Sequence, residues 1–103
     1  MDTIRGAYFM TKINVAYEGK FLSGRSHAVE LVDRLMKSQP NLPIVFDLDG
    51  VESVSQAFVS ELLVALKKYG IQFQEINFTG VKDKEIEARI RREIERLSQL
   101  MAS

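Results

Sequence analysis

The sequence predicts a single α/β domain, with a small mixed sheet of about four strands and three helices in the order β-β-α-β-α-β-α. Short segments with alternating or continuous apolar residues are interspersed along the chain with longer segments whose apolar residues recur at helical spacing. Glycine or proline stands at most boundaries between these segments, as expected where a chain turns. The length of 103 residues fits one domain covering 1–103, with one hydrophobic core.

Three regions carry the predicted strands. Residues 12–18 alternate apolar and polar side chains, which predicts a half-buried strand that 21–22 continue after a turn. Residues 43–48 begin with an uninterrupted apolar run, which is typical of a central strand covered on both faces. Residues 71–78 alternate again and predict the last strand.

The N-terminal segment 1–10 fits two interpretations. Its apolar residues could form a loose additional strand, or the segment could be a tail. The translation start is either Met1 or Met10, and the second choice would leave this segment out of the protein.

The first predicted helix opens in the loop Ser23-Gly24-Arg25-Ser26 and ends before Pro40, which cannot continue a helical ladder. The second helix is predicted to start at a capping box, Ser53-x-x-Gln56, and to end before Gly70, which takes the left-handed cap position. Apolar spacing places the following side chains toward the core: Ala28, Leu31, Val32, Leu35 and Met36 on the first helix, and Phe58, Leu62, Ala65, Leu66 and Tyr69 on the second.

The last helix is predicted over 82–102, with Asp83 as its N-cap. Two ion pairs at four-residue spacing, Glu85–Arg89 and Glu87–Arg91, are expected to add less than about 1 kcal/mol together. The buried stripe of this helix is predicted as Ile86, Ile90, Ile94, Leu97 and Met101.

The C-terminal end of this helix carries more apolar residues than a short sheet needs. Leu97, Leu100 and Met101 either pack on the N-terminal segment or form the seam of a homodimer through the C-terminal helix. The arginines Arg89, Arg91 and Arg92 alternate with glutamates, which favours a solvated helix face over a nucleic-acid patch.

Composition excludes several classes of function. Fourteen basic and fourteen acidic residues cancel, so nothing draws the chain toward nucleic acid or an anionic membrane. Cysteine is absent and His27 is the single histidine, which excludes thiol catalysis, disulfides and multi-histidine metal sites. No apolar run approaches the length of a membrane span, and the N-terminus lacks a signal-peptide pattern. We expect a cytoplasmic protein without cofactor or metal.

An acidic corner follows the central strand. Phe46-Asp47-Leu48-Asp49-Gly50-Val51 resembles the first motif of haloacid-dehalogenase-type phosphatases, in which the first aspartate attacks phosphate and the second protonates the leaving group. That family needs further acidic and basic motifs on later strands of a larger sheet, and the residues after Gly50 predict one more strand. A small Mg²⁺-dependent phosphoryl-handling enzyme using Asp47 and Asp49 is therefore kept as the alternative hypothesis.

Three motifs taken together resemble the STAS-like family of unknown function, small bacterial relatives of anti-sigma-factor antagonists. They are Phe21-Leu22-Ser23-Gly24-Arg25-Ser26-His27-Ala28, Val45-Phe46-Asp47-Leu48-Asp49-Gly50-Val51, and Val54-Ser55-Gln56-Ala57-Phe58-Val59-Ser60-Glu61-Leu62. Their order and spacing carry the resemblance.

The resemblance implies a non-catalytic regulatory module that docks on a protein partner such as a GHKL-type kinase or ATPase. The docking residues it implies lie in the loops before the first and second helices and at the acidic corner: Ser23, Arg25, Ser26, Asp49, Ser55, Gln56 and Ser60. A third hypothesis is that the same surface binds a small ligand, as some STAS domains do.

The chain departs from the family pattern at the position that is phosphorylated in such antagonists. Alignment of the motifs puts Gln56 or Ala57 there, and neither can accept a phosphoryl group. Ser55 stands one residue earlier and is the candidate phosphosite, while its other predicted role is that of a serine at a helix start.

Overall fold

The computed structural model describes residues 10–101, and these form two small parallel sheets and three α-helices. The larger sheet has the order β1-β3-β5, with β1 at Thr11–Asn14, β3 at Ile44–Asp47 and β5 at Ile76–Thr79. The smaller sheet pairs β2, Phe21–Leu22, with β4, Ser53–Val54. The predictions made for residues 1–9 and for the last residues of the chain lie outside the described residues.

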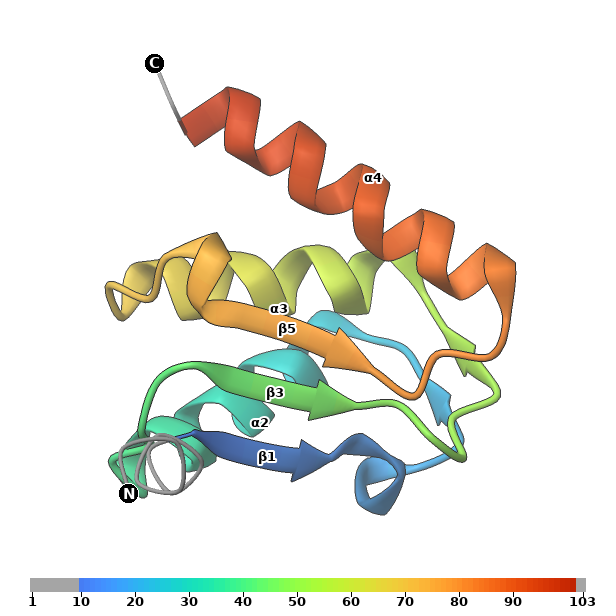
Figure 1. Ribbon diagram of the computed structural model, residues 1–103, viewed down its shortest axis with the longest axis horizontal. Helices are drawn as coiled ribbons and strands as arrows, with labels where there is room; N and C mark the ends of the chain where they lie inside the picture. The colour runs from blue at the N-terminus through green and yellow to red at the C-terminus, as the bar shows by residue number, and fades with distance from the viewer. Residues whose placement is uncertain (1–9, 102–103) are drawn as a thin grey trace, which may run out of the picture.

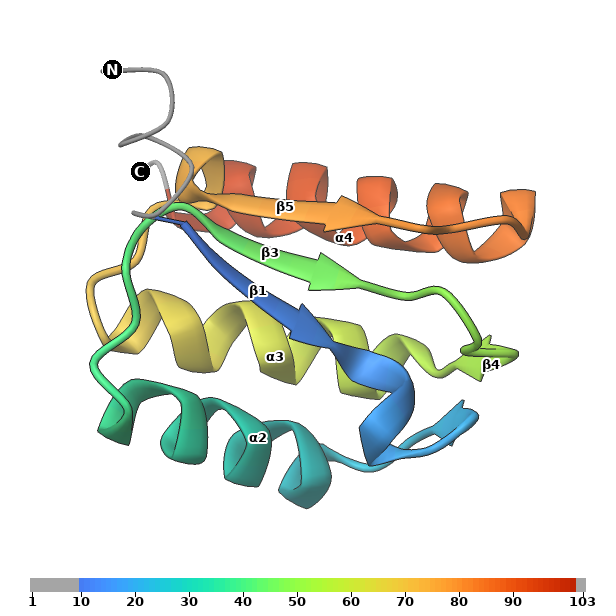
Figure 2. The same cartoon turned by 60° about the horizontal axis from the view of Figure 1, so that its bottom comes forward.

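Helices α2 (Arg25–Lys37) and α3 (Gln56–Lys68) lie side by side on one face of the larger sheet, and α4 (Lys84–Met101) packs on α3 beyond β5 (Figures 1 and 2). Short 3₁₀ helices, η1 at Val15–Glu18 and η2 at Phe73–Glu75, follow β1 and precede β5. No described helix is long and apolar enough to cross a lipid bilayer.

The expected mixed sheet is wrong, because every described strand pair is parallel. Helix α2 lies between β1 and β3 in the chain, and α3 lies between β3 and β5, so each helix carries the chain back and the next strand of the larger sheet starts in the same direction. The second face of this sheet carries the exposed Lys12, Asn14, Asn77 and Thr79. A parallel sheet with one solvated face explains why β1 and β5 alternate polar and apolar residues.

The first strand is shorter than predicted. Asn14 pairs with Asp47, and β3 ends at Asp47, so the chain after Asn14 has no neighbour that could continue the ladder. The backbone turns into η1 within the segment predicted as strand, which buries Val15 and leaves Tyr17 exposed. Glu18 then faces α2, where it accepts hydrogen bonds from His27 and Arg34.

The core fills the space between the larger sheet and its helices. Phe46 is fully buried on β3 and stacks on Phe78 of β5, its register partner, with ring centroids 5.5 Å apart. Phe58 of α3 is buried as predicted, and its ring contacts the ring of His27 edge-on, with ring centroids 5.7 Å apart. The helical stripes predicted from sequence supply most of the rest: Ala28, Leu31, Val32, Leu35, Leu62, Ala65, Leu66, Ile86, Ile90 and Leu97.

Helix α3 is buried over a wider arc than one stripe. It contacts α2 on one side and α4 on the other, so Val59 and Leu63 are buried as well. Tyr69, predicted to face inward, is 50% exposed and donates its hydroxyl to Asp33 of α2 at 2.9 Å. Tyr69 is the C-cap residue that follows α3, and its ring stays at the surface.

The helix ends confirm some predicted caps and correct others. Asp83 Oδ1 accepts from the Glu85 amide at 2.7 Å, as an N-cap should. Gly70 follows α3 in a Schellman arrangement, in which its own amide donates to Lys67 and the Ile71 amide donates to Leu66.

The predicted capping box at Ser53 and Gln56 is wrong. Ser53 lies in β4 and pairs with Phe21, while the N-cap of α3 is Ser55, whose hydroxyl accepts from the Phe58 amide at 3.0 Å. A capping box does form at Gln72 and Glu75, where it starts η2 inside the segment predicted as strand. The last strand therefore begins at Ile76 instead of residue 71.

Helix α4 presents its predicted stripe with one unexpected member. Ile86, Ile90 and Leu97 are buried, and so is Glu93, a charged residue on the same side. The predicted Glu87–Arg91 pair forms at 2.6 Å. Arg89, predicted to pair with Glu85, instead donates to the backbone carbonyl of Val54 at 2.8 Å.

Candidate functional site

The loops before α2 and α3 lie next to each other, at the end of the molecule where the strands of the larger sheet finish (Figures 1 and 2). The pairing of β2 with β4 brings them together, because Leu22 pairs with Val54 and the Ser55 amide donates to the Leu22 carbonyl at 2.8 Å. Both loops lie at the same end because the strands that lead into them run in the same direction.

The first of these loops is exposed. Gly24 is the N-cap of α2 and offers no side chain for a capping hydrogen bond. Ser23 and Ser26 face solvent. Arg25 reaches across to α3 and pairs with Glu61 at 3.2 Å, which ties the start of α2 to the second turn of α3.

Gln56 and Ser60, predicted as partner-binding residues, contact α4. The Gln56 amide donates to Glu93 Oε1 at 2.9 Å, and Arg96 donates both to Glu93 Oε2 at 2.8 Å and to the Ser60 hydroxyl at 3.2 Å. This network joins the first turns of α3 to the middle of α4.

Glu93 is the centre of that network and is 4% exposed. The Arg96 hydrogen bond is the main cause that lowers the pKa of Glu93, with weaker help from Gln56 and Ser60, and burial opposes it. The carboxylate is therefore ionised and bonded at both oxygens, which satisfies a charge that would otherwise be costly to bury.

Ser55, the candidate phosphosite, lies between these contacts. Its hydroxyl caps α3 through the Phe58 amide, and its side chain is half-buried. The helix-start role predicted for Ser55 is confirmed by this bond. Its role as phosphosite stays a prediction.

Sequence reasoning missed the contribution of α4 to this surface. Arg89, Arg92 and Arg96 line one shallow depression of about 300 Å³ beside Gln56, and Arg25 lines the adjoining depression of about 320 Å³. We call the surface formed by Arg25, Gln56, Arg89, Arg92 and Arg96 the arginine face. Spacing of three and four residues could have placed the three α4 arginines on one side, but not next to α3.

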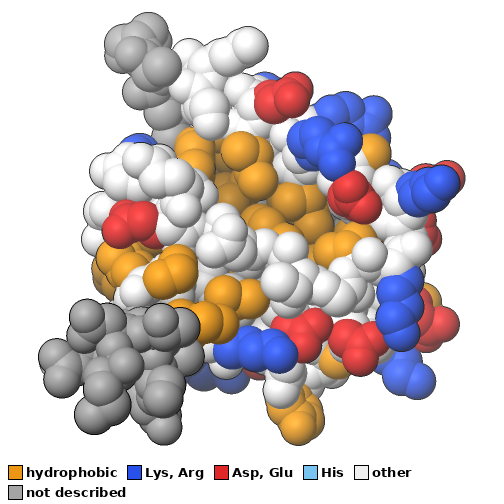
Figure 3. Space-filling view, viewed as in Figure 1, with side chains coloured by type: hydrophobic (Ala, Val, Ile, Leu, Met, Phe, Trp, Pro, Cys, Tyr) orange, Lys and Arg blue, Asp and Glu red, His pale blue; other side chains and the backbone are white. Residues whose placement is uncertain are grey.

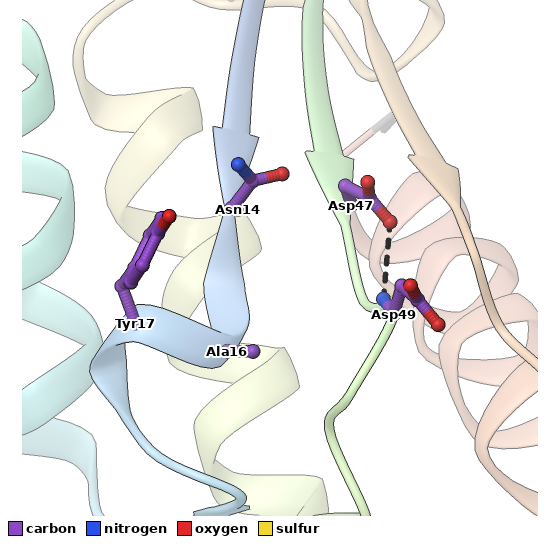
Figure 4. A pocket seen from close by; sticks show the side chains of 5 residues that line it. All are labelled: Asn14, Ala16, Tyr17, Asp47 and Asp49. Carbon is purple, nitrogen blue, oxygen red and sulfur yellow. Dashed lines mark hydrogen bonds between the residues drawn. The ribbon is translucent and has the colours of Figure 1, made fainter.

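Asp49 belongs to a different depression. Polar residues end all three strands of the larger sheet in register, with Asn14 and Thr79 on either side of Asp47. Asp47, Asp49, Asn14, Ala16 and Tyr17 line a depression of about 340 Å³ (Figure 4). Asp47 Oδ1 accepts from the Asp49 amide at 3.0 Å, which folds the acidic corner into a tight turn.

Both carboxylates of the acidic corner face lysines. Lys12 lies 3.5 Å from Asp47 Oδ2, and Lys82 lies 3.1 Å from Asp49 Oδ1. Among residues 10–101, no three or more His, Asp or Glu side chains form a group that could hold a metal ion. Phosphoryl chemistry at this corner stays a prediction.

Hydrophobic side chains gather in a band across the upper part of Figure 3, and a depression that Thr79 and Gly80 help to line lies between the end of β5 and α4. Phe78, Val81 and Ile90 line it together with Glu87, and its volume is about 260 Å³. Leu97 is buried in the chain's own core, and the homodimer through the C-terminal helix stays a prediction.

Comparison of the chain with protein-family models, with curated proteins and with solved structures gives no match in any of the three.

Proposed function

We propose that this chain is a non-catalytic, STAS-like regulatory module that binds a protein partner through the joined loops before α2 and α3. The partner class proposed from the motifs is a GHKL-type kinase or ATPase. The observation that carries the proposal is the β2–β4 pairing, which merges two helix starts into one surface.

That surface has the character of a docking site. Phe21 on β2 is 71% exposed beside Ser53, so a large aromatic ring is available to a partner. Charged and amide side chains surround the start of α3 and include Arg25, Gln56 and Arg92. An apolar anchor beside polar groups is the usual composition of a protein–protein interface.

Helix α4 belongs to this proposed surface. Gln56 and Ser60 are bonded to Glu93 and Arg96, so a partner that reaches the first turns of α3 meets α4 as well. The interface we propose therefore has three sides, formed by the starts of α2 and α3 and by the arginine-bearing side of α4.

Ser55 is the proposed point of regulation. A phosphoryl group there would add about −1.5 to −2 charges at the start of α3. Arg89 is bonded to the carbonyl of Val54, the residue just before it. The added charge would change the electrostatics of the whole docking surface, and with it the affinity for the partner.

Site-specific photo-crosslinking in the cells that produce the chain tests the proposal. A benzoylphenylalanine replaces Ala57, which lines the arginine face, or Ser26, which is exposed at the start of α2. The matched control position is Gln74, which is exposed in η2 at the other end of the molecule.

We expect the same protein, a kinase or ATPase, to be captured from Ala57 and Ser26 and not from Gln74. Capture that is equal from all three positions, or absent from the first two, would refute docking at this surface. Ser55→Asp adds a negative charge at the start of α3. In the chain that carries benzoylphenylalanine at position 26, this variant should change the amount of crosslinked partner if Ser55 regulates binding.

A further inference from the structure

The side of α4 that borders α3 carries a row of positive charge. Arg89, Arg92 and Arg96 follow one another at intervals of three and four residues, so they project from one side of the helix. That side lies against the start of α3, since Arg89 donates to Val54 and Arg96 donates to Ser60.

The positive charges of this row are only partly neutralised. Arg96 pairs with Glu93, and Arg25 across the depression pairs with Glu61. Arg89 is held by a neutral carbonyl, and Arg92 makes no hydrogen bond or ion pair with the described part of the chain. Four arginines thus meet two carboxylates, and two guanidinium charges remain in excess.

One of the two excess charges is held in place, and the other lines the same depression. The bond from Arg89 to Val54 fixes one guanidinium at the edge of the depression, and Arg92 lines the same depression three residues along the helix. Side chains three apart on a helix lie roughly 5–6 Å apart at their Cβ atoms, a spacing that suits two neighbouring carboxylates. A guanidinium binds a carboxylate through two parallel hydrogen bonds.

We propose that the arginine face selects an acidic segment of the partner, with Asp or Glu carboxylates received by Arg89 and Arg92. This inference rests on the proposed function and adds the chemistry of the partner. A long nucleic-acid polyanion fits less well, because Glu61 and Glu93 lie within the same face and the chain's net charge is zero.

The test is an NMR titration of the full-length, isotope-labelled chain with a short glutamate homopeptide at low ionic strength. Arg92→Gln is the informative variant, because Arg92 has no contact on which the described fold depends. Arg91→Gln is the matched control, since Arg91 is the next residue on the same helix and pairs with Glu87.

We expect shifts centred on Gln56, Ala57 and Arg92, and an affinity about threefold to tenfold weaker in Arg92→Gln than in the wild type. Arg91→Gln should bind as the wild type does, and added salt should weaken all binding. Equal losses in the two variants, or shifts spread over unrelated surfaces, would overturn the proposal.

Two further measurements separate this inference from its alternatives. Inorganic phosphate that binds the arginine face as tightly as the peptide would identify a small-anion site and overturn the acidic-segment proposal. The second measurement repeats the photo-crosslinking from position 26 in the Arg92→Gln variant. If the amount of crosslinked partner is unchanged, the docking function stands and the acidic-segment proposal is refuted. If no partner is crosslinked from position 26 even when Arg92 is present, the docking function itself is refuted.

Discussion

Gly80, just after β5, occupies a position where a side chain has no room. Its φ is +71°, and a Cβ atom added there would lie 2.3 Å from Asp47 Oδ1 and 2.8 Å from the Asp49 amide nitrogen. Gly24 also has a positive φ, +89°, but nothing lies within 4 Å of a Cβ built on it. The two glycines therefore separate backbone strain from steric overlap.

We predict that Gly80→Ala lowers the free energy of unfolding more than Gly24→Ala does. The strained φ alone costs about 1–2 kcal/mol, and overlap at the acidic corner adds about 1–3 kcal/mol. Urea denaturation of both variants measures the difference. Equal losses would mean that the Asp47–Asp49 turn moves aside without cost.

Glu18 gives the stability of the chain a dependence on pH. Its carboxylate accepts from His27 Nε2 at 2.9 Å and from Arg34, and the bond from Arg34 is the main cause that lowers its pKa below the ordinary 4.5. Burial opposes this shift, and His27 adds to it. A lowered folded-state pKa means that the folded state binds a proton less readily than the unfolded state does.

We predict that the contribution of Glu18 is complete above about pH 4.5 and is lost as the pH falls through its lower folded-state pKa. Glu18→Gln should be less stable than the wild type at neutral pH, with the difference shrinking in acid. Denaturation curves at several pH values measure this. A constant difference between the two proteins across that range would contradict it. Glu93, whose pKa is also lowered, leaves part of the acid dependence in the variant.

At the scale of elements, the periodic pattern of α4 predicts its buried apolar residues, whereas a tertiary contact determines the burial of one charged residue. The apolar stripe was readable because α4 buries Ile86, Ile90 and Leu97 at helical spacing. Glu93 lies on the same side of α4, and the sequence alone predicts that a glutamate among arginines is solvated. It is buried because α3 supplies Gln56 and α4 supplies Arg96 as partners.

Two leucines near the end of α4 allow the contribution of this helix to the free energy of unfolding to be measured. Leu97 is 4% exposed and Leu100 is 61% exposed. We predict that Leu97→Ala costs about 2–4 kcal/mol, because it removes buried side-chain volume, and that Leu100→Ala costs less than about 0.5 kcal/mol. Thermal or urea denaturation checks both values. A large loss in Leu100→Ala at high protein concentration alone would favour the predicted dimer through this helix.

The whole molecule is organised around β3. This strand has a partner on each side, β1 and β5, whereas β2 and β4 share two residue pairs. Val45 and Phe46 are neighbours on β3, so their side chains point to opposite faces of the sheet. Both are buried, although the face that carries Val45 is mainly polar. The resistance of backbone amides to opening should follow this arrangement.

We predict that native-state hydrogen exchange is slowest at the amides of Val45 and Phe46. The Ser55 amide, bonded to Leu22 in the small sheet, should exchange faster through local opening. Exchange measured by NMR under native conditions distinguishes the two. Equal protection would show that the joined loops open only when the whole domain unfolds, which would make the docking surface rigid.

The sequence by itself determined the three α-helices, most of their buried stripes, and a central strand, predicted over 43–48 and observed at Ile44–Asp47, with the acidic corner that ends it. These features depend on residues close in the chain: apolar periodicity, a proline stop, Asp83 as a cap and Gly70 after α3. Local spacing is sufficient to predict them, because the interactions that form them span one or two turns.

The tertiary structure alone decided where strands end, which caps are used and what surrounds the start of α3. Strand β1 stops at Asn14 because its partner stops at Asp47, a limit set on another part of the chain. The arginine face depends on α4 lying against α3, which joins residues more than thirty positions apart. Nothing in local periodicity encodes such a contact, because it follows from how helices pack once the sheet has formed.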